Sequence, residues 1–420
     1  MIYFMTFVKQ MTRKQQFILI LILGALSTIS PFSIDMYLPG FPAIARDLGT
    51  SIAAVQLSLT SYFIGIAVGQ ILYGPLLDRF GRKIPLYVGL SIYILASLGC
   101  ALTNSVESLI AMRFLQALGG CAGMVAAQTL VRDLFPSNKM AQAFSSMTLV
   151  VAISPMIAPT IGGYMTALFG WHSVFIVLSV ITALAIVCVY FVLPRGKKPD
   201  RSISLKPGAV IGNFYTVIRQ PQFLIYTLAG GLASSAPFAY IAGSSDVFMN
   251  LYGSSEKEYG WIFAIVAFVI IASTQLNHKL LKKYKSEQII KFTLLYQTVV
   301  GIVLVIGTIY GWYGKLSLIA FIAVFLAGHG LINPNAVALA LAPFSRHTGS
   351  AASLSGSFRM AVGGVASALV SAFHNHTAIP MVSIMVGCSV TGLFFLAAGK
   401  TTVRYKARKK DVEEEPSVLI

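Results

Sequence analysis

The chain has 420 residues, of which 56% are hydrophobic and only 11% are charged, and its mean hydropathy is +0.78. A soluble domain of this length could not carry so apolar a composition on its surface, so the sequence predicts a polytopic membrane protein. The net charge of +17 does not indicate a nucleic-acid partner, because the lysines and arginines gather in short segments between apolar runs and at the C-terminus.

The composition also argues against a cofactor and against an enzyme. All four cysteines lie inside apolar segments without CxxC or CxxH spacing, so neither a disulfide framework nor a zinc site is expected. The sequence has no HExxH motif, no cluster of histidines with carboxylates and no phosphate-binding loop. We therefore expect no metal, no cofactor and no catalytic residues.

Apolar runs of about 20 residues, long enough to cross a bilayer as helices, occur roughly twelve times. Six lie in the first half of the chain, near residues 16–38, 55–73, 84–103, 108–131, 141–167 and 173–193. Six lie in the second half, near residues 223–245, 261–281, 289–310, 316–342, 351–373 and 381–398. The sequence thus predicts an all-α membrane protein of twelve transmembrane helices.

The basic residues predict the topology. They occur in both termini and in every even-numbered loop, whereas the odd-numbered loops carry little charge, so both termini should be cytoplasmic. The longest polar connection divides the spans into two bundles of six. The expected organisation is a cytoplasmic N-terminus at 1–15, a first bundle at 16–194, a cytoplasmic linker at 195–220, a second bundle at 221–398 and a cytoplasmic tail at 399–420.

In the first span, Asp35 lies deep in the run ISPFSIDMYLPGFP. A lone ionised carboxylate is costly inside a membrane, so Asp35 should face a cavity or a partner, and we interpret it as a proton carrier. The alternative is that Asp35, which precedes Pro39 and Pro42, is a helix-end residue in water at the outer surface. Tyr37 is a candidate for the wall of a substrate cavity.

Residues 74–83, GPLLDRFGRK, form a short charged loop between the second and third spans. Its two glycines permit turns that a side chain would block, and its three basic residues outnumber its one aspartate. The net positive charge keeps such a loop cytoplasmic. Any short inner loop would be basic, but the ordered pattern of Gly, Asp, Arg, Gly, Arg and Lys is more specific than charge alone.

In the fourth span, Arg113 is the stronger signal for function. A guanidinium stays charged at any relevant pH, so it needs an acceptor or a wet cavity, unless it extends to the membrane surface near Glu107. Gln116 lies three residues on and shares the helix face of Arg113. We include Gln116 among the candidate cavity residues.

The fifth span contains two prolines four residues apart and a pair of glycines, in the run SPMIAPTIGGY. The prolines, Pro155 and Pro159, remove backbone hydrogen bonds and bend the helix, while Gly162 and Gly163 let another helix come close. A generic kinked packing helix and a functional hinge explain this pattern equally well.

Three further polar residues lie inside spans of the second half. Asp246, near the end of the seventh span, and Arg359, in the eleventh, could form a salt bridge, a second coupling site or a specificity group for a charged substrate. His329, midway along the tenth span, could titrate near neutral pH or simply pack beside its flanking glycines. All three are candidates for the substrate cavity.

Taken together, these motifs resemble those of the twelve-helix drug:proton antiporters of the major facilitator superfamily. The resemblance runs from about residue 12 to residue 400 and is carried by DMYLP in the first span, the 74–83 loop, Arg-x-x-Gln-x-x-Gly in the fourth span and Ala-Pro-x-x-Gly-Gly in the fifth. The run DMYLP, with NPN at 333–335 and GSA at 349–351, is most similar to the bicyclomycin and chloramphenicol resistance subfamily. Ala158 departs from the wider antiporter pattern, which has Gly before Pro.

This resemblance implies roles for the residues named above. Asp35 and Arg113 would couple transport to protons, and Pro155, Pro159, Gly162 and Gly163 would form the antiporter motif of the fifth helix. A cytoplasmic gate would comprise Gly74, Asp78, Arg79, Gly81, Arg82 and Lys83.

We therefore predict a monomeric, multi-pass protein of the bacterial inner membrane that exports small, mostly apolar compounds in exchange for protons. Its partners would be a small-molecule substrate, the proton and the lipid bilayer, without nucleic acid. The alternative is a proton-coupled symporter, or an exporter of one small metabolite such as an amino acid, because the same fold supports both directions of transport.

Overall fold

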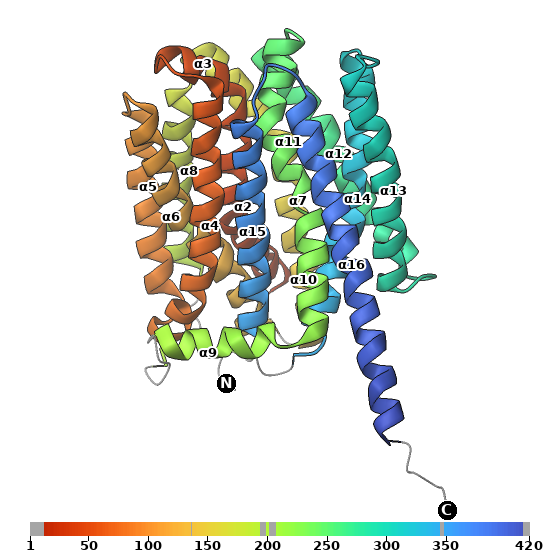
Figure 1. Ribbon diagram of the computed structural model, residues 1–420. Helices are drawn as coiled ribbons and strands as arrows, with labels where there is room; N and C mark the ends of the chain where they lie inside the picture. The colour runs from red at the N-terminus through yellow and green to blue at the C-terminus, as the bar shows by residue number, and fades with distance from the viewer. Residues whose placement is uncertain (1–11, 136, 194–198, 201–206, 345–347, 415–420) are drawn as a thin grey trace, which may run out of the picture.

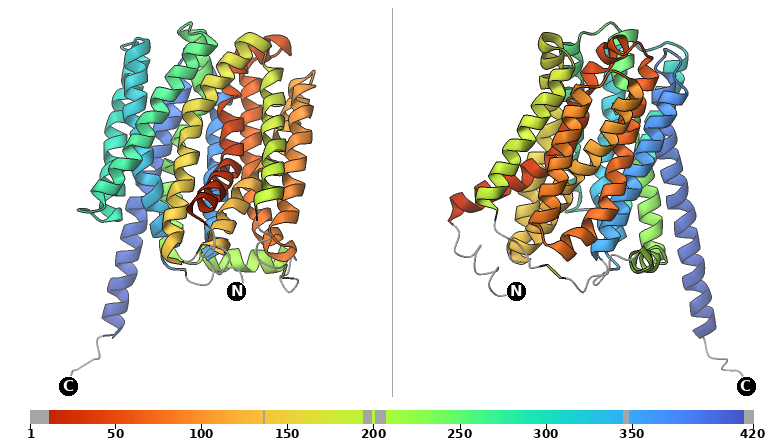
Figure 2. Two further views of the ribbon diagram at one scale, coloured as in Figure 1. Left: turned by 180° about the vertical axis from the view of Figure 1, so that it is seen from behind. Right: turned by 90° about the vertical axis from the view of Figure 1, so that its left-hand side faces the viewer.

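A computed structural model of the chain describes residues 12–135, 137–193, 199–200, 207–344 and 348–414. Within these ranges the fold is entirely helical and contains no strand, and most of the helices run side by side along one axis (Figures 1 and 2). The prediction of an all-α membrane fold is confirmed.

The first half of the chain forms a group of long helices with one short interruption after the first. Their bounds are α2 (Arg13–Asp35), the 3₁₀ turn η1 (Leu38–Gly40), α3 (Phe41–Asp47), α4 (Ile52–Phe80), α5 (Lys83–Ala101), α6 (Val106–Leu134), α7 (Ser137–Phe169) and α8 (His172–Val192). Asp35 is thus the last residue of α2 rather than a residue in mid-helix, as the helix-end alternative predicted, yet its side chain is only 4% exposed.

The second half repeats this arrangement. Its elements are α10 (Pro221–Ala233), α11 (Ala236–Ser245), the π-helical turn η2 (Asp246–Leu251), α12 (Glu256–Leu280), α13 (Ser286–Ile309), α14 (Lys315–Leu341), α15 (Thr348–Ala372) and α16 (Ile379–Glu414). Between the halves, α9 (Pro207–Ile218) lies across one end of the molecule, and α3 lies at the opposite end (Figure 1). We call these the α9 end and the α3 end.

The helix α9 was not predicted from the sequence. It lies inside the 195–220 connection, most of whose preceding residues fall outside the described part of the chain. On α9, Val217 is fully buried and Phe214 is partly buried, whereas Ile211 and Tyr215 are exposed. A helix with this division of faces is typical of a segment that lies along a membrane surface.

Eleven of the helical segments described are long and apolar enough to cross a membrane. The predicted span at 351–373 is not among them, although α15 has 25 residues, about 37 Å of helix. Serines, glycines and Arg359 lower the hydropathy of α15. Several of these polar side chains face other helices of the protein rather than lipid. The number of twelve transmembrane helices stays a prediction.

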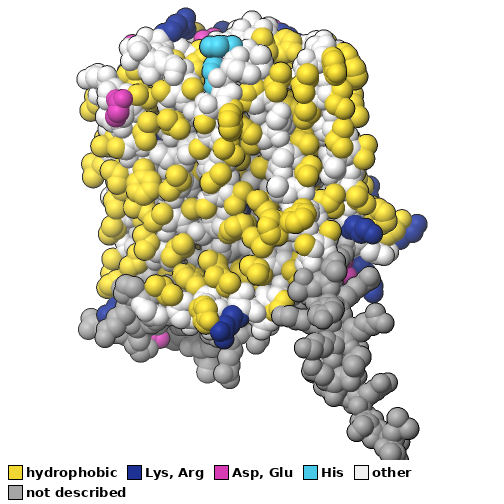
Figure 3. Space-filling view, in the orientation of Figure 1, with side chains coloured by type: hydrophobic (Ala, Val, Ile, Leu, Met, Phe, Trp, Pro, Cys, Tyr) yellow, Lys and Arg dark blue, Asp and Glu magenta, His cyan; other side chains and the backbone are white. Residues whose placement is uncertain are grey.

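The flanks of the molecule are apolar. On the face drawn in Figure 3, hydrophobic side chains cover the middle of the molecule, and most of the charged side chains lie towards its two ends. Large exposed residues such as Leu95, Tyr190 and Phe292 would be unfavourable in water and suit contact with lipid tails.

Several helices that start at the α3 end have serine N-caps. Ser51 Oγ accepts a hydrogen bond from the Ala54 amide at 3.1 Å, and Ser105 Oγ accepts one from the Ser108 amide at 3.2 Å. Ser255 and Glu258 form a reciprocal capping box at the start of α12. These caps satisfy amides at helix ends that have no partner within the helix.

Candidate transport site

A cavity of about 870 Å³ lies between the two halves of the chain and reaches the α9 end. Its wall includes residues of α4, α6 and α7 from the first half and of α10, α14 and α15 from the second, and Asn213 and Phe214 of α9 also line it. A cavity of this size is large enough for a drug-sized molecule. Its position between the halves makes it the candidate site for a transported compound.

Residues 74–83, which we predicted to be a loop, are mostly helical: α4 continues to Phe80 and α5 begins at Lys83. Four of these residues form one edge of the cavity: Gly74, Pro75, Asp78 and Arg82. Arg82, whose side chain is 4% exposed, donates from Nη1 to Asp78 Oδ1 at 2.6 Å and from Nε to Asp133 Oδ2 at 2.6 Å. Burial by itself lowers the pKa of the Arg82 guanidinium, but hydrogen bonds and charge from Asp133 and Asp78 outweigh burial and leave this pKa above its ordinary value. Arg82 therefore joins the end of α4 to the end of α6.

Asp133 was not among the residues predicted from the sequence. The available signal was an acidic residue in an otherwise basic inner loop, which needs a nearby cation. The ion pair links residues 51 positions apart, so only the packing of α4 beside α6 reveals it.

Of the two glycines predicted for the gate, only one is required by the backbone conformation. Gly81 has a φ of +83°, which residues with a side chain rarely adopt, so this position needs a glycine. Gly74 lines the cavity with open space where a Cβ would lie, so packing does not require a glycine there. The guanidinium of Arg79 lies 5.9 Å from the centre of the Phe80 ring, and Lys83 is the first residue of α5.

Arg113 is fully buried inside the first half, in a cage of aromatic rings. Its guanidinium carbon lies 4.1 Å from the ring centre of Tyr62, 4.5 Å from that of Tyr37 and 5.7 Å from that of Phe175. Such contacts stabilise a desolvated cation. The prediction that Arg113 needs an acceptor is met by the Gln116 side chain at 2.6 Å and the Ser33 carbonyl at 3.2 Å.

Tyr37 and Gln116 complete this buried network instead of lining the cavity. The Tyr37 hydroxyl lies 2.9 Å from Ser58 Oγ, and Gln116 Nε2 donates to Ser97 Oγ at 2.6 Å. Neither residue is part of the cavity wall. Both act on Arg113, Tyr37 through its ring and Gln116 through its amide oxygen.

Asp35 is not paired with Arg113. Among the described residues, the Asp35 side chain has neither a hydrogen bond nor an ion pair. Its carboxyl group lies near the side chains of Tyr240 in α11 and Tyr259 in α12, so it faces the second half of the chain. The two residues assigned to proton coupling are therefore not in contact with each other in this conformation, and their shared role stays a prediction.

The glycines of α7 lie where two other elements approach most closely. A Cβ added to Gly162 would overlap the Met36 carbonyl oxygen, and one added to Gly163 would overlap the Glu256 carbonyl oxygen at the start of α12. Across the same contact, a Cβ on Gly260 would lie 2.8 Å from Thr160 Cα. The α7 helix continues through Pro155 and Pro159. This packing brings the two halves together at the α3 end.

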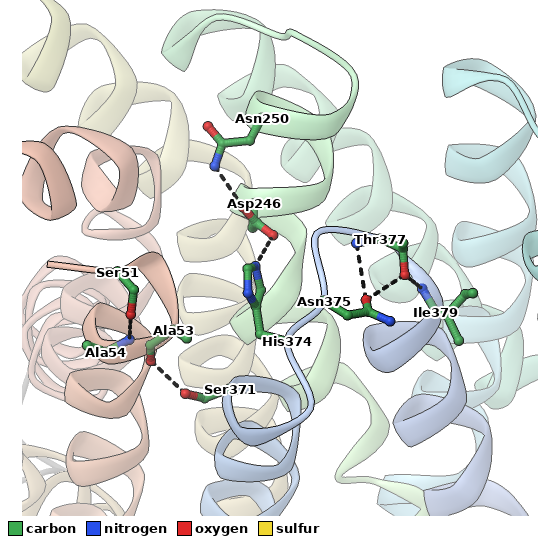
Figure 4. A network of polar contacts seen from close by, with 10 residues as sticks. All are labelled: Ser51, Ala53, Ala54, Asp246, Asn250, Ser371, His374, Asn375, Thr377 and Ile379. Carbon is green, nitrogen blue, oxygen red and sulfur yellow. Dashed lines mark hydrogen bonds and ion pairs between the residues drawn. The ribbon is translucent and has the colours of Figure 1, made fainter.

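A second contact between the halves runs along α4 and α15. Ser357 Oγ donates to the Ala67 carbonyl at 2.8 Å, Thr60 Oγ1 donates to Ser367 Oγ at 2.9 Å, and Ser371 Oγ donates to the Ala53 carbonyl at 2.6 Å (Figure 4). These three serines of α15 therefore face α4 and not lipid. This arrangement explains how α15 can be less apolar than its neighbours.

Asp246 lies at the α3 end, away from the cavity. Its carboxylate is bonded to His374 Nε2 and to Asn250 Nδ2, both at 2.7 Å, as Figure 4 shows. His374 follows α15, so this pair fixes the loop between α15 and α16 to the start of η2. The possibility that Asp246 forms a salt bridge with Arg359 is wrong.

Five residues were predicted to line a substrate cavity, and Arg359 is the one among them that lies in the wall of the cavity formed by the described residues. Its Nη1 donates to Asn333 Oδ1 of α14 at 2.7 Å. His329, on the same helix as Asn333, lies near Arg359 but is not part of the wall.

These features define a class of protein: a helical membrane transporter with a cavity between two halves that is closed at one end. The sequence pattern of the Major Facilitator Superfamily matches residues 23–368, so the chain belongs to this superfamily, as its motifs predicted. It is a multi-pass protein of the inner membrane and a carrier of small molecules.

Individual relatives agree with this assignment. The chain is 35% identical to a bicyclomycin resistance protein homolog of Haemophilus influenzae, over 92% of this chain and 98% of that protein. It is 27% identical to a chloramphenicol resistance protein of Pseudomonas aeruginosa, over 77% and 75%. Among solved structures, a D-xylose-proton symporter superimposes with a TM-score of 0.68 at 15% identity, over 92% of this chain and 97% of that one.

Proposed function

We propose that this protein exports small, mostly apolar compounds such as antibiotics across the inner membrane in exchange for protons, by alternating access. The observation that carries the proposal is the cavity between the halves, which reaches the α9 end while α7 packs on α12 at the α3 end. The names of the bicyclomycin and chloramphenicol resistance relatives support export as the direction of transport. The transporting unit is a single chain with a small-molecule substrate and a proton.

In this proposal, the α9 end faces the cytoplasm, because the basic loops predicted to be cytoplasmic lie there. The cavity then receives its substrate from the inside. Arg82, with Asp78 and Asp133, holds the inner ends of α4 and α6 together at the edge of the cavity. Opening to the outside requires the contacts of Gly163 and Gly260 to separate.

Asp35 is the proposed proton carrier. Its carboxyl is buried between the halves and has no cationic partner among the described residues, so this arrangement favours the protonated, neutral form. Opening of the α3 end would expose Asp35 to water and favour ionisation. Proton binding from the outside therefore promotes closure of that end and return to the inward-facing state.

The experiment uses inverted membrane vesicles that are acidified inside, with a dye that reports the internal pH. Chloramphenicol-like and cationic compounds are added to vesicles with the wild-type protein and with Asp35→Asn. We expect at least one compound to make the interior of wild-type vesicles more alkaline, with no response in the variant. Equal expression and melting temperature of the two proteins are the control for folding.

Proton-driven export by a folded Asp35→Asn protein would overturn the role of Asp35. The absence of a response to the whole panel in the wild type would overturn drug antiport.

A second candidate function is the proton-coupled transport of one small metabolite, in either direction. The positive charge of Arg359 in the cavity wall favours it, since a purely apolar cargo does not need a cation there. Accumulation of the cargo in inverted vesicles would indicate export, and accumulation in right-side-out vesicles would indicate import.

A further inference from the structure

The wall of the cavity contains a positive charge that the protein does not neutralise. Arg359 of α15 donates to the neutral side chain of Asn333, and within the described part of the chain no carboxylate forms an ion pair with it. By contrast, Arg82 at the loop end of the same cavity has two carboxylate partners. A guanidinium within the membrane requires an acceptor, because it cannot lose its charge.

Two buried polar atoms of this wall have no partner in the part of the chain that the structure describes. They are Nε of Arg359 and Oγ1 of Thr227, a residue of α10 that is only 6% exposed. Both residues line the cavity. Two helices of the second half thus place polar groups without a protein partner at the wall of the cavity.

The orientation of the guanidinium selects the kind of acceptor. Asn333 occupies Nη1, and the edge formed by Nε and Nη2 is the one that binds both oxygens of a carboxylate side by side. Arg359 lies 11 residues into α15, about 16 Å along the helix from Thr348, so it sits deep in the cavity rather than at its edge.

The apolar part of the wall suits the remainder of such a molecule. Met124 and Val125 of α6 lie on the side of the first half, and Pro334 and Val337 of α14 lie on the side of the second. A compound with an apolar body and one carboxylate satisfies both parts of the wall.

We propose that the cavity recognises a carboxylate-bearing substrate, with Arg359 as its anchor and Thr227 as a second donor. The inference rests on the proposed function and refines it, because it names the chemical class of the exported compound. A planar carboxylate with an apolar body should bind, and the same body ending in a neutral amide should bind much more weakly.

The test compares acid and amide forms of the same body on the purified full-length protein. The probes are N-acetylphenylalanine and its amide, N-acetylleucine and its amide, and benzoate and benzamide. We expect at least one acid to bind the wild type about tenfold or more tightly than its amide, as a charge-assisted pair predicts. In Arg359→Gln the two forms should bind equally.

Three further variants separate charge from geometry. Arg359→Lys keeps the charge but loses the planar fork, so it should retain only part of the preference. Arg46→Gln removes an exposed arginine of α3, outside the cavity wall, and should leave the preference unchanged. Thr227→Val should weaken binding of the acid more than that of the amide. If Arg359→Gln does not fold, Arg359→Lys and Thr227→Val still decide.

The inference is overturned if no acid binds more tightly than its amide, or if a folded Arg359→Gln protein keeps the preference. Binding does not depend on proton coupling, so the two proposals fail separately. Acid-selective binding without antiport in vesicles would remove only the proposed function, and antiport without acid preference would remove only the carboxylate site.

Discussion

The contact between α7 and α12 predicts how the two conformations of the transporter can be shifted. A Cβ added to Gly260 would lie 2.8 Å from Thr160 Cα and 3.0 Å from the Pro159 carbonyl oxygen. Both are backbone atoms, so α7 or α12 must move by about 0.6 Å to restore an ordinary contact of about 3.4 Å. This overlap exists only when the α3 end is closed.

The cost follows from this geometry. Overpacking against backbone is expected to cost about 2 kcal/mol in the closed state, which changes the ratio of the two conformations roughly thirtyfold. The gain in helix propensity from Gly to Ala applies to both conformations and cancels in their ratio. Gly260→Ala should therefore populate an outward-open state that is rare in the wild type.

The assay is the distance between spin labels at the α3 end, one on Arg46→Cys in the first half and one on Tyr310→Cys in the second. Cys188 and Cys388, the two native cysteines that are not buried, are first replaced by alanine. Gly387→Ala is the matched control, because nothing lies within 4 Å of the added Cβ. The reasoning is refuted if Gly260→Ala gives the same distance distribution as the wild type and Gly387→Ala.

Three other substitutions test separate parts of the structure. Gly162→Ala meets the Met36 carbonyl within the same half, so it should lower the melting temperature without a change in the spin-label distances, and a changed distribution would contradict this. Asp133→Asn removes the carboxylate that accepts a hydrogen bond from Nε of buried Arg82, and it should lower the free energy of unfolding by about 1–3 kcal/mol. The control is Arg132→Gln, at the exposed neighbouring residue. Equal melting temperatures of the two variants would argue against the ion pair. Arg113→Met should be no less stable than Arg113→Lys, because lysine leaves a buried charge without the planar guanidinium that Gln116 and Ser33 bind. A melting temperature of Arg113→Lys well above that of Arg113→Met would contradict this prediction.

Local properties explain why so much of the fold could be predicted from the sequence. Apolar runs locate helices because a bilayer leaves the backbone no other way to satisfy its hydrogen bonds, and this holds for each segment by itself. The exception is instructive. The span at 351–373 is less apolar because it contains Ser357, Ser367 and Ser371, which form hydrogen bonds with α4. These serines are 10 and 4 residues apart, so they lie on one face of the helix, and this spacing in the sequence indicates a helix that packs against another helix.

The site was less predictable because its contacts join distant segments. The partners of Arg82 and Arg359 lie 51 and 26 residues away, and hydropathy contains no information about which helices meet. The sequence identified charges that need partners, but it did not show that aromatic rings of its own half surround Arg113.

The separation of Asp35 from the cavity limits how protons and substrate can be coupled. Asp35 is buried at the end of α2, where it faces the second half, and it is not part of the cavity wall. That wall extends from the residues around Arg82 to Arg359. A proton on Asp35 and a substrate at Arg359 therefore do not occupy the same volume in this conformation. Any competition between them must act through the conformation that each one favours. The contacts of α7 with α12 and of α4 with α15 join the halves and must rearrange when that conformation changes. The helix packing around Gly163 and Gly260 is thus as much a part of the coupling as the two charged residues.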